Sequence, residues 1–234
     1  MPLNNSSITF EVISNNDDFI IIDKPDNLNF HDETQLGEGL FNQVKAQLQL
    51  KELYPVHRLD KMTSGLIIFA KNLSCAQWFQ QQFEQHAIDK YYLALSDKKP
   101  KKKQGLIKGD MVKARRGMWK LMRSQRNPAI TQFFSFSLAN NTRLFIVKPA
   151  TGKTHQIRVA LSSIGSPIIG DTYYHCATTH DRGYLHAYAL KFIYKNQSYQ
   201  LMSAPSSGSL FTDPYVISTL ANIGEPWNLK WPSL

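Results

Sequence analysis

The sequence predicts a single α+β domain with one hydrophobic core. The chain has 234 residues, of which 42% are hydrophobic, enough for a substantial core within the size range of one domain. Short apolar and β-branched runs are interspersed with segments of helical spacing, and the middle of the chain is mostly of the β type. Because we find no internal repeat and no second domain, we expect one domain over residues 1–234, with its core at about residues 8–205.

The first elements are a predicted hairpin and a helix. Residues 8–14 and 19–23 are rich in apolar and β-branched side chains, and the Asn and Asp residues between them are typical of a turn. Leu40, Val44 and Leu48 then recur at helical spacing, which predicts a helix reaching about Gln49 after a long loop.

A polar segment, HRLDKMTSG, follows and leads into the compact apolar run at residues 66–70. This run is short enough to be a buried strand, so Asp60 is expected in a loop that feeds it. Ser74 and Gln77 have the spacing of a capping box, which predicts a helix ending near His86.

Further strands are predicted at residues 91–95, 130–137, 143–147 and 185–194, the last strand of the chain. Thr154 is a suitable N-cap for a helix that Gly165 would end. Arg158 lies on a different face of this helix from its apolar residues, so it could point into a site. The tail from Ser206 has no clear periodicity.

The charge balance indicates a polyanionic partner. Lys and Arg outnumber Asp and Glu by 27 to 18, and the sequence pI is about 9.5. The excess is concentrated at residues 98–126, where Asp110 is the only acid. Such a block can follow a phosphate backbone, and Trp119 could stack on a base; the alternative is a solvated loop. The residues expected to contact RNA here are Lys113, Arg115, Arg116, Trp119 and Lys120.

Other functional classes fit less well. TGKT at residues 151–154 lacks the preceding glycine of a phosphate loop, because Val147 occupies that position. His175, Cys176 and His180 have no fourth metal ligand at a recognisable spacing, and no second acid accompanies Asp60 as in a glycosidase. We therefore expect no metal and no cofactor.

The N-terminus lacks a secretory pattern and no apolar run reaches membrane-spanning length, so we expect a cytoplasmic protein without a membrane partner. Cys75 and Cys176 are expected to be reduced thiols. Too few residues precede the domain for a separate N-terminal RNA-binding domain, and we expect a monomer.

Three segments, in order along the chain, resemble the RluA family of RNA pseudouridine synthases. They are HRLDKMTSGLIIFAKN (57–72), KYYLAL (90–95) and PATGKTHQIRVALSSIGSPIIGDTYY (149–174), followed by LHAYAL (185–190). The opening DDFIIIDKPDNL is similar to the family's strand and Lys-Pro turn. The resemblance covers about residues 8–190. It implies a mixed, largely antiparallel central sheet flanked by helices and loops, and an enzyme that isomerises uridine in RNA to pseudouridine.

The resemblance also implies roles for individual residues. Asp60 would be the single catalytic carboxylate, acting either as a nucleophile or as the base that triggers elimination. Arg158 would keep it charged and orient it through a two-point contact. Tyr92 would stack on the uracil, with its hydroxyl near the proton lost from the fifth carbon, whereas Tyr91 would face the other side of the strand.

For RNA binding, Arg58 resembles the family arginine that fills the space left by the flipped base, although a generic phosphate contact is an equal alternative. His57 and Lys153 are counted with the RNA-contacting residues, but the chemistry needs no imidazole, so His57 and His155 are expected to be structural. Ribosomal and transfer RNA both remain open as partners, and DNA is not expected. The alternative to an enzyme is a non-catalytic basic RNA-binding protein with the same fold.

Three positions depart from the family pattern. Asn27 follows the Lys-Pro turn where glycine is usual, and asparagine is the next best residue for a left-handed backbone. Met62 replaces an acidic residue, and Lys153 replaces an arginine. None of these changes removes the residues that the chemistry requires.

Overall fold

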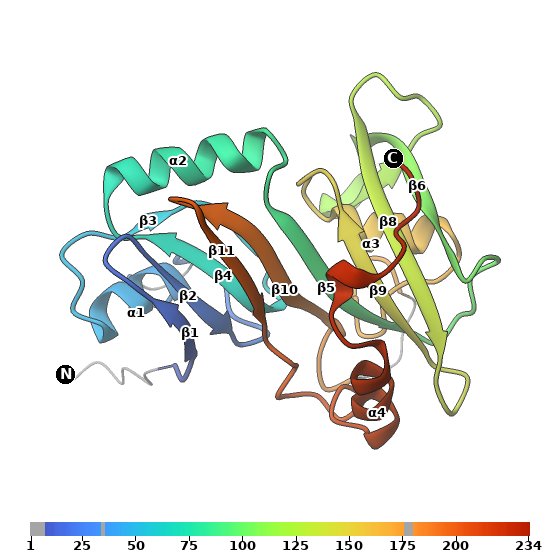
Figure 1. Ribbon diagram of the computed structural model, residues 1–234. Helices are drawn as coiled ribbons and strands as arrows, with labels where there is room; N and C mark the ends of the chain where they lie inside the picture. Colours follow the sequence, from blue (N-terminus) through green and yellow to red (C-terminus); the bar gives the residue numbers. More distant parts are fainter. Residues whose placement is uncertain (1–7, 34–35, 176–179) are drawn as a thin grey trace.

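The computed structural model describes residues 8–33, 36–175 and 180–234 (Figure 1). Within them, eleven strands form one sheet in the order β1-β2-β4-β10-β5-β9-β8-β6-β7, with β3 added to β4 and β11 to β10. The pairing of β4 with β10 is parallel, and all the others are antiparallel. The mixed, largely antiparallel sheet expected from the sequence is therefore confirmed.

The strands and helices of the described residues have the following bounds. The strands are β1 (Glu11–Asn15), β2 (Phe19–Lys24), β3 (Tyr54–Pro55), β4 (Ser64–Ala70), β5 (Asp89–Ser96), β6 (Gln104–Lys113), β7 (Trp119–Leu121), β8 (Pro128–Ser137), β9 (Arg143–Pro149), β10 (Leu185–Tyr194) and β11 (Gln197–Met202). The helices are α1 (Leu40–Gln47), α2 (Leu73–Glu84), α3 (Gln156–Ser163) and α4 (Pro214–Ile223), with short 3-10 turns at Arg115–Gly117 and Pro226–Asn228.

The β2 and β4 strands contain the continuous apolar runs 19–22 and 66–70, because both faces of this part of the sheet are covered. Phe19 and Ile21 pack with Phe79 of α2 on one face, while the intervening Ile20 and Ile22 share the other face with α1. Figure 1 shows the two helices on opposite sides of these strands. The predicted hairpin, first helix and buried strand are all present.

The second half of the sheet forms the larger core cluster together with α3 and α4. Ile157 and Leu161 of α3 face this core, as the sequence predicts, and Val216 brings in α4. The α3 helix also contacts β7, β8 and β9. The residues before α3 approach β5 at the middle of the sheet, where Gly152 lies next to the Lys90 side chain.

Two helix starts differ from the prediction. Asn72, rather than Ser74, caps α2, since its side chain accepts the Cys75 amide hydrogen at 2.9 Å and Ser74 lies inside the first turn. The α3 helix begins at Gln156, with His155 in a left-handed conformation (φ 56°) as N-cap in place of Thr154. Its predicted end is confirmed, with Gly165 at φ 77°.

Elements in three regions were not predicted. The basic block contains β6 and β7, whose apolar positions are interrupted by charged residues such as Lys108, Asp110 and Lys120. The β11 strand follows β10 through Lys195 and Asn196, both at positive φ, which is the geometry of a type I′ hairpin turn. In the tail, α4 has Asp213 as N-cap and Pro214 in its first turn. The prediction that β10 is the last strand was therefore wrong.

No helix among the described residues is long and apolar enough to cross a membrane. The same residues contain no group of three His, Cys, Asp or Glu side chains that could hold a metal. His175 bonds Asp97 at 3.0 Å, and Cys75 is a buried free thiol. Cys176 lies outside the described residues.

Candidate active site

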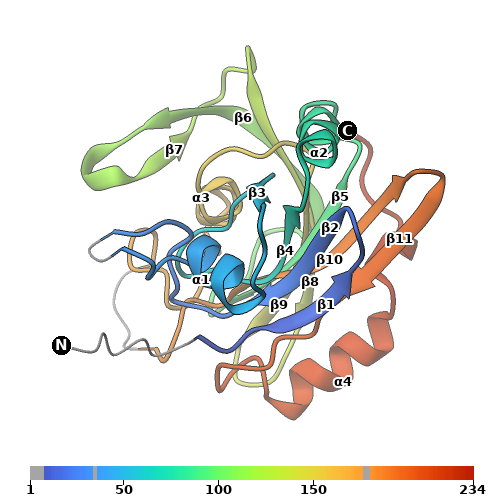
Figure 2. The ribbon, with the colours of Figure 1, turned by 90° about the vertical axis from the view of Figure 1, so that its left-hand side faces the viewer.

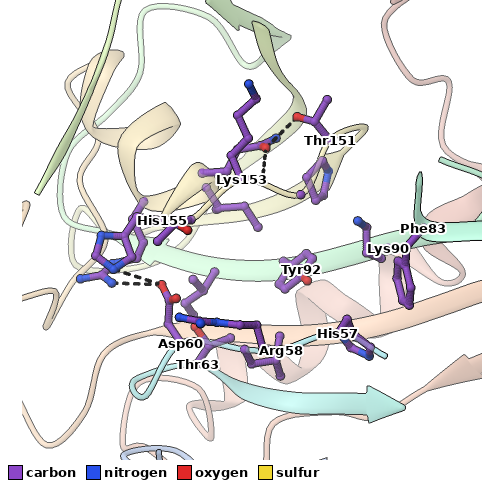
Figure 3. Close-up of a pocket in the computed structure, with 18 of the residues that line it drawn as sticks. His57, Arg58, Asp60, Thr63, Phe83, Lys90, Tyr92, Thr151, Lys153 and His155 are labelled. Atoms are coloured by element: carbon purple, nitrogen blue, oxygen red, sulfur yellow. Dashed lines mark hydrogen bonds and ion pairs between the residues drawn. The ribbon is translucent and has the colours of Figure 1, made fainter. Parts of the chain in front are cut away.

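A cleft of about 480 Å³ opens where the loop before β4, strand β5 and the segment leading into α3 meet (Figure 3). All three quoted motif segments contribute to it. The residues that line it are Val56, His57, Arg58, Leu59, Asp60, Thr63, Gln80, Phe83, Glu84, Lys90, Tyr92, Pro149, Thr151, Gly152, Lys153, Thr154, His155, Gln156, Ile157, Arg158 and Leu185.

Asp60 lies in the loop between β3 and β4, which several contacts hold in place. The Thr63 amide donates to the Asp60 carbonyl at 3.0 Å, and the fully buried Lys24 donates to the carbonyls of Pro25 and Lys61 at 2.8 and 3.2 Å. These bonds use the backbone and leave the Asp60 carboxylate free to face the cleft, where its side chain is 21% exposed.

Arg158 comes from α3 and reaches the same carboxylate. Its Nη1 donates to Asp60 Oδ2 at 3.0 Å, so the expected partnership of Asp60 and Arg158 is present. The expected two-point contact with Asp60 is wrong, because Nε and Nη2 bond both oxygens of Asp171 instead, at 2.7 and 2.8 Å. Asp171 fixes the plane of the guanidinium, and the remaining edge points at Asp60.

Asp171 is a site residue that the sequence reasoning missed. It is buried and also accepts the Tyr173 amide hydrogen at 3.0 Å. Burial opposes the charge of Arg158, but hydrogen bonds and attraction from Asp171 and Asp60 outweigh it and raise the pKa of the guanidinium. The signal in the sequence was an acid directly after the apolar run SPIIG, yet nothing in the spacing names its partner.

His155 lies closer to the carboxylate than expected for a structural residue. Its Nε2 is 3.9 Å from Asp60 Oδ2, and its Nδ1 is 3.1 Å from the Tyr174 hydroxyl. Burial and the nearby charge of Arg158 lower the pKa of this histidine. A neutral imidazole therefore borders Asp60 at neutral pH, held by a tyrosine that the sequence reasoning did not single out.

Tyr92 projects from β5 into the cleft, and Figure 3 shows it between Asp60 and Lys90. Burial and the charge of Asp60 raise the pKa of its hydroxyl, so it stays protonated at neutral pH. Tyr91 faces the other side of the strand, where its ring contacts Trp227 and Trp231, as predicted.

Similarity to known proteins identifies the family of this chain. The sequence pattern of the family described as RNA pseudouridylate synthase matches residues 18–163. A protein of Haemophilus influenzae named as an uncharacterized RNA pseudouridine synthase is 50% identical over 90% of this chain and 94% of its own length. The chain belongs to the RluA family of RNA pseudouridine synthases. It is therefore an isomerase that acts on RNA.

A more distant relative and a solved structure are also similar to this synthase. The ribosomal large subunit pseudouridine synthase C of Rickettsia bellii is 36% identical over 71% of this chain, which matches 58% of that protein's length. The solved structure of human RNA pseudouridylate synthase domain containing 1 superimposes with a TM-score of 0.73 at 22% identity, over 86% of this chain and 85% of the human one. The latter likeness shows that the two proteins share the fold.

The two predicted RNA contacts beside Asp60, Arg58 and His57, differ in exposure and in bonding. Arg58 is exposed at the cleft and forms no ion pair with any residue that the structure describes. His57 accepts the Ile68 amide hydrogen at 2.9 Å, and burial and the charge of Lys90 lower its pKa to about 3. Because His57 is neutral and bonded to β4, any contact of His57 with RNA would use its uncharged ring, and this contact stays a prediction.

Lys153 and the basic block lie along the α3 side of the cleft. Lys153 donates to the Asn127 side chain at 3.0 Å, so it is committed to the loop before β8. The β6–β7 hairpin extends past α3 (Figure 2) and exposes four of the predicted RNA contacts, while the fifth is half-buried beneath Lys113. The exposed residues are Lys113, Arg115, Arg116 and Lys120, and the half-buried one is Trp119.

The hairpin is joined to the cleft through Tyr174. The Trp119 amide donates to the Tyr174 hydroxyl at 2.8 Å, and the same hydroxyl meets His155. The backbone of β7 and the residues around Asp60 are thus linked through one side chain. The departure at Asn27 is also explained, since its φ of 56° is the left-handed conformation expected for a glycine replacement.

Proposed function

We propose that this synthase converts a uridine of ribosomal or transfer RNA to pseudouridine, with Asp60 as its catalytic carboxylate. The observation that carries the proposal is the placement of Asp60. It is the acid held by Arg158 inside the cleft, and Tyr92 lies beside it. The volume of the cleft and its mixed polar and apolar lining both suit one extruded nucleotide.

The reaction breaks the bond from the ribose to the base nitrogen and forms one from the same ribose carbon to the fifth carbon of uracil. The proton lost from that carbon is balanced by one gained at the freed nitrogen, so nothing is oxidised and no group is imported. Asp60 begins the reaction as a nucleophile or as the base for elimination. Both routes need an ionised, oriented carboxylate, which the Arg158 contact supplies.

Tyr92 holds the uracil while it turns. Its aromatic ring offers a face for stacking. Because the pKa of its hydroxyl is raised, the hydroxyl stays protonated in the resting enzyme and can donate a hydrogen bond rather than accept a proton. Apolar contacts from Leu59, Ile157 and Leu185 line the same cleft and exclude water around the turning uracil.

The uridine must leave its stack before it can enter, which costs a few kcal/mol. Arg58 is our candidate for the side chain that occupies the vacated space, because it is an exposed guanidinium without an ion-pair partner among the described residues. The name of the Rickettsia bellii relative supports ribosomal RNA as the substrate. We propose that the enzyme acts as a cytoplasmic monomer.

Substitution of Asp60 tests the assignment. Asp60→Asn keeps the side-chain shape but removes the charge, and we expect it to abolish tritium release from RNA labelled at the fifth carbon of uridine. The loss should correspond to at least about 4 kcal/mol in the barrier, while RNA binding survives. Asp17→Asn, an exposed acid in the β1–β2 turn, is the matched control. Equal activity of Asp60→Asn and wild type would reject the assignment.

The substrate is found by a separate measurement. Pseudouridines mapped in total RNA from cells with and without the gene should differ at one or a few positions. Loss of a position in ribosomal RNA would support the substrate class that we favour, and loss in transfer RNA would select the other.

A further inference from the structure

Lys90 is a cation in the cleft for which no residue that the structure describes supplies a hydrogen-bond acceptor. Its Nζ lies 5.5 Å from the centre of the Phe83 ring. The adjacent Asp89 is committed elsewhere, since one of its oxygens pairs with Lys148 at 2.8 Å and the other accepts the Tyr91 hydroxyl at 3.2 Å. Lys90 therefore lines the cleft without a direct ion pair to any carboxylate among the described residues.

The surroundings of Lys90 are suited to an anion. Glu84, an acid that lines the same cleft, accepts a bond from Gln80 at 3.0 Å and forms no ion pair with Lys90. A side chain at Gly152 would start only 3.7 Å from Nζ, and glycine leaves that space open. Burial lowers the pKa of Lys90, and attraction from Asp89 offsets this effect only in part, as expected for a partly desolvated ammonium that no carboxylate bonds directly.

We propose that Lys90 binds a phosphate group of the RNA next to the uridine held on Tyr92. This inference rests on the proposed function, because it takes Tyr92 as the support for the base. Lys90 and Tyr92 project from the same face of β5, two residues and so roughly 6.8 Å apart. Figure 3 shows Lys90 on the opposite side of Tyr92 from Asp60. A nucleotide stacked on Tyr92 brings its own phosphates to this part of the cleft.

A phosphate is the RNA group that best matches this position. A lysine ammonium is a compact point charge on a flexible stem, and phosphate oxygens are strong acceptors for it. Binding would supply an ion-pair partner for Lys90 and favour the charged form of its ammonium. The contact would also let the enzyme distinguish a uridine within a polynucleotide from the free nucleoside, which carries no phosphate.

The test uses uridine 3′,5′-bisphosphate as the probe and uridine as its uncharged counterpart. Lysine Cε signals of the isotopically labelled protein are followed by NMR, and the Lys90 signal is identified by its loss in Lys90→Met. We expect the bisphosphate to shift the Lys90 signal and raise the pKa of its ammonium, and uridine to do neither. Binding of the bisphosphate should be about tenfold weaker in Lys90→Met, with uridine binding unchanged.

Two further variants make the result specific. Lys90→Arg keeps the charge and should retain most of the bisphosphate affinity. Lys51→Met removes an exposed lysine outside the cleft and should bind like wild type. An unmoved Lys90 signal, or equal bisphosphate binding by Lys90→Met and wild type, would overturn the proposal. Failure of the proposed function is seen separately, as absence of tritium release from cellular RNA by the wild-type enzyme.

Discussion

Arg158 and Lys90 are cations of the same cleft with opposite surroundings. Arg158 meets two carboxylates, Asp171 and Asp60, and their combined effect raises its pKa. Lys90 meets an aromatic ring and open space, and burial lowers its pKa. At the Arg158 end of the cleft the cation is already paired before any substrate arrives, whereas at the Lys90 end the cation has no direct ion pair among the described residues.

The difference separates two uses of positive charge. A paired guanidinium has little attraction left for a ligand, but its planar fork fixes a carboxylate in one geometry. An unpaired ammonium positions nothing inside the protein and gains most from an incoming anion. Within the cleft, the pairing of Arg158 thus indicates that it positions Asp60, whereas the lack of an ion pair at Lys90 suits contact with an incoming anion.

Among the changes considered, loss of Asp171 should have the largest effect on stability and activity, because it removes the partner that fixes Arg158. Breaking a buried ion pair typically costs about 3–5 kcal/mol, so we expect Asp171→Asn to lower the free energy of unfolding by about 3 kcal/mol. Activity should fall as well, since Arg158 would no longer be held against Asp60. Chemical denaturation and tritium release measure the two effects.

Asp97→Asn is the control for Asp171. Asp97 is also paired, with His175, but its side chain is 42% exposed, so the change should cost less than about 1 kcal/mol. If Asp171→Asn were as stable and as active as the Asp97 variant, the positioning role of the Arg158 pair would be wrong.

Lys24 gives an intermediate case, a fully buried lysine whose ammonium meets carbonyl oxygens in place of carboxylates. Burial lowers its pKa to about 7. The unfolded chain, with an ordinary lysine pKa, binds more protons than the folded protein between about pH 7 and 10. The stability of the fold should therefore rise with pH across this window, by about 2 kcal/mol from pH 7 to pH 9.

Unfolding measured at several pH values isolates this contribution. The rise should disappear in Lys24→Met and persist in Lys51→Met, whatever the absolute stabilities of the variants. The same rise in Lys24→Met would show that Lys24 keeps its proton in the fold, and that a buried cation in this protein does not need a carboxylate to stay charged.

How far the sequence could lead to the site depended on whether the family resemblance gave a residue a role. The resemblance brought Asp60, Tyr92 and Arg158 to one site although they lie far apart in the chain, and alternation along a strand separated Tyr91 from Tyr92. Asp171 was out of reach, because which edge of a guanidinium meets which acid is decided by packing between α3 and the following loop.

Strands and helices were predictable where the spacing of apolar residues and the turn or capping residues at the ends indicate the same element. The β2 and β4 strands contain unbroken apolar runs that are buried on both faces, and β10 has the predicted bounds. The β6–β7 hairpin was missed because charged residues interrupt its apolar positions, of which Ile107 belongs to the core and Leu121 packs against it. The start of α3 was misplaced because Gln156 accepts the Thr151 hydroxyl and the Lys153 amide, which holds the chain in a turn before the helix.

The exposed cations of the β6–β7 hairpin should have the smallest effect per residue, because solvent already screens them. Arg115→Gln with Arg116→Asn removes two charges at the tip, and asparagine suits the left-handed backbone at position 116 (φ 54°). If both arginines contact phosphates, the slope of log affinity against log salt should become shallower by about 1.8 for duplex RNA, taking 0.9 per contact. The rate on bound RNA should not change, since the hairpin holds no residue that meets the reacting atoms.

Lys98→Gln with Lys99→Gln removes the same charge from the turn after β5 and is the control. An equal change of slope in that control would mean that the hairpin contributes net charge rather than a binding surface.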